Sequence, residues 1–153
     1  MSETLGGDFA HILGRELDAL ADQVRKYPDD ASLWRVEGSI LNPAGTLVLH
    51  LVGNLSHFVG AVLGGSGYVR DRDAEFQRRD VPRSELLAMI GACKEDVVST
   101  LEALDDGQVT AAYPGQLPPF LTGATTHRFL VHLTGHFQWH KGQVDYHRRI
   151  LTG

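Results

Sequence analysis

The most constraining feature of the sequence is a long apolar segment, GTLVLHLVGNLSHFVGAVL, at positions 45–63. Apolar side chains occupy most of its faces, so a helix here has no solvent-facing side and must be surrounded by other elements. Asn42-Pro43 in front of it is a typical helix start, with asparagine as the N-cap and proline in the first turn. Glycines at 53 and 60 weaken such a helix by about 1 kcal/mol each relative to alanine. They would permit close approach of a neighbouring helix or a ligand. We therefore predict a central helix over residues 43–63.

Three further segments repeat apolar residues at three- and four-residue spacing, the pattern of an amphipathic helix. They cover residues 7–26, 82–104 and 123–151. Long connections separate the helices, and Leu33 and Trp34 indicate that the first connection packs down onto them. No sustained apolar–polar alternation indicates a sheet. We predict an all-α protein, a four-helix bundle with long connections, formed by a single domain over residues 1–153.

Charge and composition narrow the functional classes. The net charge is −5, so the chain has no basic excess to neutralise phosphates, and nucleic acid is not a predicted partner. No stretch approaches the ~20 apolar residues of a membrane span, and no signal-peptide pattern opens the chain. We expect a cytoplasmic protein without a membrane partner. The single cysteine, Cys93, excludes an internal disulfide and is expected to be a small buried residue rather than a nucleophile.

Four of the eight histidines lie within HLTGHFQWHKGQVDYH, residues 132–147. His132, His136 and His140 are spaced four apart, and a helix turns about 100° per residue, so they form one stripe beside the apolar face. Two histidines at this spacing can present ring nitrogens to one ion. The last helix therefore offers two overlapping ligand pairs, His132/His136 and His136/His140.

A third ligand must come from another element, and the central helix carries His50 and His57 on nearly the same face. The sequence predicts a transition-metal site built by these two helices. Two alternatives stay open: buried imidazoles bonded to backbone carbonyls and carboxylates, and metal-free acid–base chemistry. The histidine helices hold no Glu-x-x-His pair, which argues against a di-iron carboxylate centre. The chain has no HExxH motif and no serine elbow, which argues against a zincin and a serine hydrolase.

The stretches LWRVEGSILNPAGTLVLHLVGNLSHFVGAVLGG and HLTGHFQWHKGQVDYHRRIL resemble the DinB/YfiT-like superfamily of four-helix-bundle metalloproteins. Within it, the chain is most similar to a branch described only as a domain of unknown function, to which the loop GYVRDRDAEF also belongs. The resemblance covers nearly the whole chain. It implies a bundle of this type, a homodimer, and a divalent ion, usually zinc or nickel, held by three histidines.

The resemblance also selects among the histidines. The second-helix ligand of the superfamily sits in a motif like LVLHLVGN, which selects His50. The fourth-helix pair precedes Gly-Gln, as in HFQWHKGQ, which selects His136 and His140. Better-known members carry a histidine–arginine pair before Gly-Gln and often a further histidine in front of it. This chain has Lys141 and Trp139 at those positions, so the role of the extra histidine is not carried over.

Three imidazoles leave a coordination position open for water or a substrate atom, as in a catalytic rather than a structural site. Some relatives in the superfamily are thiol-dependent S-transferases, and others are hydrolase- or isomerase-like. We therefore expect a small-molecule substrate and a metal-dependent transfer of a low-molecular-weight thiol to an electrophile. A metal-dependent hydrolase and a non-catalytic, metal-stabilised binding or dimerisation module are the alternatives.

Further residues are candidates for the site because they are expected to lie near the predicted metal ligands. Gln143 lies one turn after His140 and is expected either to support a ligand or to stay on the surface. His57 and His132 are expected to support the ligands or to line the cavity. Arg70 and Arg72 are candidates for binding a substrate carboxylate, with salt bridges to Asp71, Asp73 and Glu75 as the preferred alternative. The remaining histidines, His11, His127 and His147, are expected to be structural or superficial.

Overall fold

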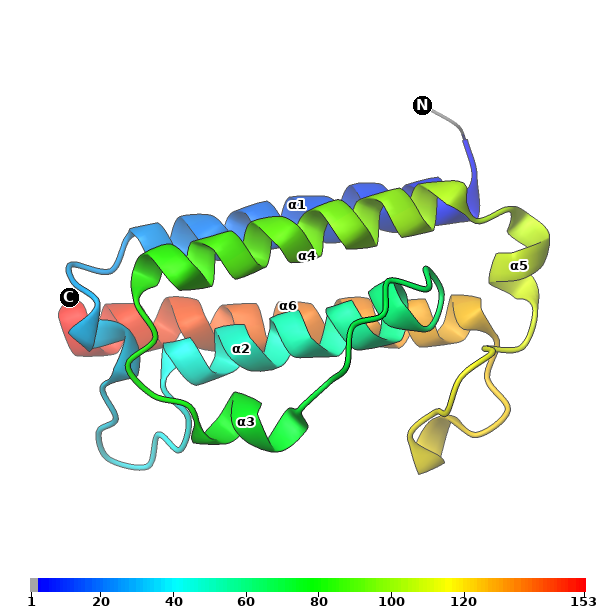
Figure 1. Ribbon diagram of the computed structural model, residues 1–153. Coiled ribbons are helices and arrows are strands. Elements are labelled where there is room, and N and C mark those ends of the chain that lie inside the picture. The colour runs from blue at the N-terminus through cyan, green and yellow to red at the C-terminus, as the bar shows by residue number, and fades with distance from the viewer. Residues whose placement is uncertain (1–2) are drawn as a thin grey trace.

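The computed structural model describes residues 3–153, and it confirms the all-α prediction. Four long helices lie in two layers (Figure 1). One layer pairs α1 (Leu5–Arg25) with α4 (Arg83–Ala103), and the other pairs α2 (Ala44–Leu55) with α6 (Thr126–Thr152). The helices within each layer run antiparallel. Residues 3–153 contain no strand, only an isolated bridge between Ala112 and Thr125.

The central helix predicted from its apolar sequence is α2, and every one of its residues is buried. The π-helical segment η2 (Ser56–Ala61) continues it, with the Val62 N–H donating to the His57 carbonyl at 3.0 Å. By length and composition, Ala44–Ala61 is the one described helix that could cross a membrane. Because 83% of it is buried inside the protein, its composition is that of a core helix.

When η2 is counted as the end of the central helix, the predicted helix ends lie within three residues of the observed ones, but one predicted cap is wrong. Pro43 is the N-cap of α2 and no side chain caps that end. Pro43 keeps an extended backbone, with ψ of 165°, so it stands outside the helix. Asn42 is thereby one residue too far away to cap it. The α6 helix begins later than predicted because Gly123 has φ of 79° and the Thr125 side chain accepts from the Arg128 N–H.

The connections contain short helices that the sequence did not predict: η1 (Ala31–Trp34), α3 (Arg72–Gln77), α5 (Asp106–Thr110) and η3 (Pro119–Leu121). Asp105 lies just after the end of α4 and forms a capping box with Gln108 that starts α5. The α3 helix packs against α2 (Figure 1). This placement brings a segment predicted as a loop next to the core helix.

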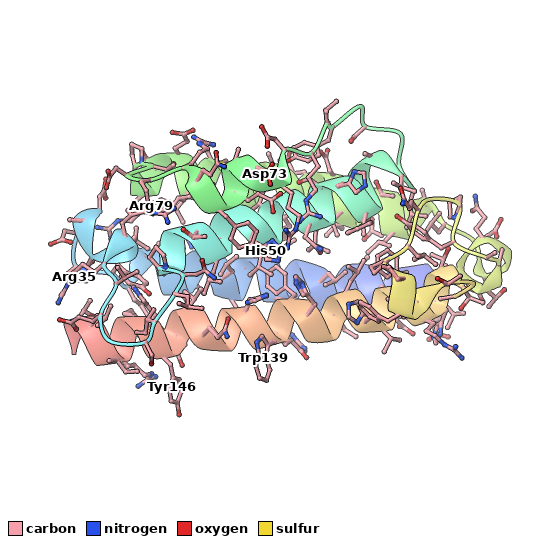
Figure 2. All side chains as sticks on the ribbon, turned by 90° about the horizontal axis from the view of Figure 1, so that it is seen from below. Arg35, His50, Asp73, Arg79, Trp139 and Tyr146 are labelled. Atoms are coloured by element: carbon pink, nitrogen blue, oxygen red, sulfur yellow. The ribbon has the colours of Figure 1, made fainter. Side chains whose placement is uncertain are left out.

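The core is formed by side chains from both layers and from the first connection. Leu33 and Trp34 are buried, as predicted, and the Trp34 indole N–H donates to the Val81 carbonyl at 3.1 Å. Cys93 is also buried, as predicted, and burial raises the pKa of its thiol to about 11. Trp139 and Tyr146 instead point outward from α6 (Figure 2). The single chain does not test the expected homodimer, which stays a prediction.

Candidate metal centre

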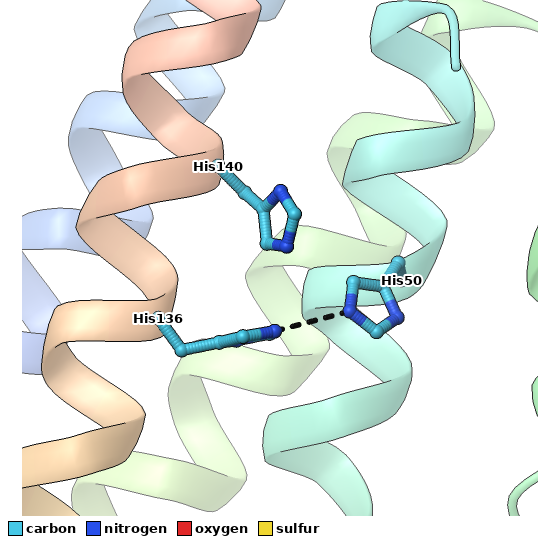
Figure 3. Close-up of side chains that lie close together, drawn as sticks. All are labelled: His50, His136 and His140. Atoms are coloured by element: carbon cyan, nitrogen blue, oxygen red, sulfur yellow. Dashed lines mark hydrogen bonds between the residues drawn. The ribbon is translucent and has the colours of Figure 1, made fainter. Parts of the chain in front are cut away.

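His50 on α2 faces His136 and His140 on α6 across the antiparallel pair of helices (Figure 3). One ligand atom from each ring lies within 4.8 Å of the other two. The Nε2 atoms of His50 and His136 are 3.1 Å apart, and the ring centroids of His136 and His140 are 4.7 Å apart. The structure thus brings together the three histidines that the resemblance selected.

Hydrogen bonds on the outer side of two rings orient their inner nitrogens. His50 Nδ1 lies 3.1 Å from Glu75 Oε1, and His140 Nδ1 lies 2.7 Å from Gln143 Oε1. Both oxygens are acceptors, which assigns the ring proton to Nδ1 in each case. The Nε2 lone pairs then point into the space between the helices, where His50 Nε2 accepts a hydrogen bond from His136 Nε2 (Figure 3).

His136 is the least satisfied of the three rings. Its Nδ1 is buried and has no hydrogen-bond partner within residues 3–153. Burial, together with His140 and His50 nearby, lowers its pKa to about 4. Burial likewise lowers the pKa of His140. These two rings are therefore neutral near pH 7, which is the form that binds a metal ion.

The donor set fits a divalent transition metal. In a tetrahedral zinc site with bonds of 2.0–2.1 Å, ligand nitrogens lie about 3.4 Å apart. The separation of 3.1 Å between two Nε2 atoms and the 4.8 Å limit for the set bracket this value. Imidazole suits zinc and nickel.

Glu75 on α3 was expected only as an ion-pair partner of the loop arginines, and its contact with His50 was not predicted. Its carboxylate is buried, accepts from His50 Nδ1, and binds Arg70 through both oxygens, with Nε–Oε2 at 2.8 Å and Nη2–Oε1 at 2.9 Å. Burial opposes ionisation, but the hydrogen bonds from His50 and Arg70 outweigh it and hold the pKa of Glu75 below its usual value. A buried carboxylate is thus held in its charged form behind a candidate ligand.

Gly53 makes room for this carboxylate. A Cβ at position 53 would stand 2.0 Å from Glu75 Oε2. The close approach expected at this glycine therefore exists, and the approaching group is a side chain of α3. Gly60 has no comparable neighbour, since the nearest atom to its Cβ position would be 3.5 Å away. A glycine three residues after His50 was the available signal that another group packs there.

A cavity of about 560 Å³ opens beside the centre, and both His50 and His136 line it. His57 and His132 lie on its wall, outside the cluster of three, and the His132 and Phe120 rings pack in a T-shaped arrangement with centroids 5.2 Å apart. Their expected place in the cavity lining is therefore observed. Gln143 contacts His140 and does not line this cavity.

The two candidate arginines differ in their partners. Arg70 is engaged by Glu75, which is the salt-bridge alternative, whereas the Arg72 guanidinium lies 5.0 Å from the centroid of Phe76. Both line the cavity. Within residues 3–153 Arg72 forms no ion pair, so its charge is available to a ligand.

The other histidines take the structural or superficial places expected for them. His147 is buried, with Nδ1 at 2.7 Å from the Tyr27 hydroxyl and Nε2 donating to the Arg35 carbonyl at 2.8 Å. His11 and His127 are exposed. Lys141, which follows His140, forms an ion pair with the buried Glu16 of α1 and so ties α6 to the other layer.

Comparison with known proteins gives a family but no activity. No curated protein and no solved structure matches the chain significantly. The family described as "Protein of unknown function (DUF1572)" matches residues 14–151. The matched span contains the three clustered histidines, Glu75 and the cavity. The chain therefore belongs to this family of unknown function.

Proposed function

We propose that this protein is a DinB/YfiT-like four-helix-bundle metalloprotein that transfers a small thiol to an electrophile. The observation that carries the proposal is the convergence of His50, His136 and His140, from two facing helices, at the wall of a cavity. With three protein ligands, a zinc or nickel ion would keep a position for a substrate atom. Such an ion would supply Lewis-acid activation of a bound thiol.

The residues of the chain support this role by holding the ligands and by leaving the cavity open. Glu75 and Gln143 fix the orientation of two rings, and burial keeps His136 neutral. The thiol must come from outside, because Cys93 is buried on α4 and its S–H points at the Val52 carbonyl. The cavity has the size of small-molecule sites.

The test uses tag-free protein loaded with zinc or nickel and a chromogenic reaction. Glutathione or 2-mercaptoethanol would attack 1-chloro-2,4-dinitrobenzene: a C–S bond forms, the C–Cl bond breaks, chloride leaves, and the thiol proton passes to the buffer. We expect turnover that needs the metal, is lost in His136→Ala, and persists in His11→Ala, which removes an exposed histidine outside the centre.

The same samples separate the alternatives. Hydrolysis of p-nitrophenyl acetate without thiol turnover would favour the hydrolase. Metal binding with neither reaction, and with a large loss of thermal stability in chelator, would favour the non-catalytic module. Wild-type protein that refuses both zinc and nickel would overturn the proposal.

A further inference from the structure

We propose that the cavity beside the histidine cluster binds a small organic carboxylate with an apolar body, and that Asn54 and Arg72 recognise its polar groups. This inference rests on the proposed function, because it names the class of substrate that the centre would act on. It is carried by Asn54, by the charges in the cavity lining, and by its apolar wall.

Asn54 lies one helical turn after His50, so both side chains leave α2 on the same face. Only 7% of Asn54 is exposed, and it lines the cavity. No group in residues 3–153 hydrogen-bonds its carboxamide. Its amide oxygen and nitrogen reach the solvent in the cavity, because Thr126 Oγ1 and His136 Nδ1 are the buried unpaired side-chain atoms among the described residues. The Asn54 carboxamide is therefore available to a ligand that enters the cavity.

The charged groups of the lining favour an anion. The lining contains two arginines, and no described aspartate or glutamate lines it. Glu75 binds Arg70 from behind the wall, so this arginine is already neutralised. Arg72 keeps its charge and lies over the Phe76 ring, which holds the guanidinium at the rim. A guanidinium binds a carboxylate through paired hydrogen bonds.

Apart from Gln116, the remaining lining is apolar. Its largest members are Phe58, Leu117, Pro119, Phe120, Phe129 and Leu133. Phe120 on η3 is 72% exposed, and among the described aromatic rings it packs only against His132. An aromatic or aliphatic ligand body would cover this exposed ring and remove apolar surface from water. The ligand class is thus an anion with an apolar body.

The experiment compares 4-phenylbutyrate with its neutral amide, 4-phenylbutyramide, by calorimetric titration of the zinc-loaded full chain. We expect the acid to bind at least about 10-fold more tightly, the scale of a hydrogen bond to a charged group. Arg72→Met should remove this preference. Arg78→Met should keep it, because Arg78 on the same segment pairs with Glu85 at 3.1 Å.

Two Asn54 variants test the amide. Asn54→Leu should weaken both compounds by about 5-fold, the scale of one neutral hydrogen bond. Asn54→Asp, of nearly the same size, should weaken the acid more than the amide. We expect each Asn54 variant to keep the wild-type zinc content, because Asn54 is not one of the three clustered residues. Equal binding by wild type and both variants would remove Asn54 from the site.

His136→Ala separates this inference from the proposed metal chemistry. If Arg72 holds the carboxylate, the preference for the acid survives in His136→Ala even when zinc binding is lost. A preference that disappears in His136→Ala and persists in Arg72→Met would place the carboxylate on the metal and overturn the proposal. Equal binding of acid and amide to wild type would overturn it as well.

Discussion

The Glu75 carboxylate accepts a hydrogen bond from His50 Nδ1 at 3.1 Å while Arg70 binds both of its oxygens. A carboxylate in this position fixes the tautomer and the orientation of a coordinating imidazole and raises its basicity. Glu75 is therefore a positioning residue for the candidate centre, and α3 is the element that delivers it.

Replacing Glu75 by glutamine keeps the shape of the side chain and removes its charge. We expect the dissociation constant for zinc to rise 10- to 100-fold, the usual effect of losing such a partner. Competition with a chromogenic chelator measures it. The matched control is Asp73→Asn on the exposed side of α3 (Figure 2), which should bind zinc as wild type does. Wild-type zinc affinity in Glu75→Gln would refute the positioning role.

Gly53→Ala should disturb the same carboxylate from the other side. The new Cβ would stand 2.0 Å from Glu75 Oε2, so the Glu75 side chain must move away from His50. Overpacking would destabilise the folded protein by about 1–3 kcal/mol. The higher helix propensity of alanine would stabilise it by roughly 1 kcal/mol relative to glycine. We expect stability to change by less than about 2 kcal/mol and zinc affinity to fall as in Glu75→Gln.

Two comparisons make the Gly53 result specific. Gly91→Ala, on α4 with open space around its Cβ position, should raise stability by about 1 kcal/mol without changing zinc affinity. The double variant Gly53→Ala/Glu75→Gln should lose little more zinc affinity than either single variant, because both act through one contact. Fully additive losses would contradict the shared mechanism.

Removal of metal should lower the thermal stability of the wild-type protein. A ligand at 100 times its dissociation constant stabilises the folded state by about 2.7 kcal/mol. For a chain of this size that corresponds to a Tm shift of about 5–10 °C. Differential scanning calorimetry with zinc and with EDTA should show this shift in wild type and none in His136→Ala. An equal shift in both proteins would place the stabilising ion elsewhere.

Cys93 should be inert in the folded protein. It is 2% exposed, and burial raises the pKa of its thiol to about 11, so the thiolate is scarce and shielded. We expect no reaction with a disulfide reagent such as DTNB until denaturant unfolds the chain, when one equivalent reacts. Rapid reaction of native protein would contradict the assignment of Cys93 to the core.

The helices and the clustered histidines were predictable because their signals are local. Apolar periodicity marks each long helix, and a four-residue spacing places His136 and His140 on one face of α6. The spacing alone left His132 and His57 as equal candidates. Their exclusion depends on how α2 and α6 face each other, which is a tertiary property.

The contact of Glu75 with His50 and the unpaired amide of Asn54 were not predicted, and the reasons differ. Glu75 lies 25 residues from His50, in a segment with no helical periodicity, so its contact exists only once α3 packs on α2. Asn54 lies within an apolar helix, and the sequence does not indicate whether its amide is hydrogen-bonded or free. Both become visible when side-chain partners are known.

Anomalous diffraction from crystals of the tag-free, zinc-loaded protein tests the central claim most directly. The account predicts a peak within about 2.0–2.1 Å of one ring nitrogen each from His50, His136 and His140. A loaded protein with no peak between α2 and α6, or with zinc bound only by other side chains, would contradict it.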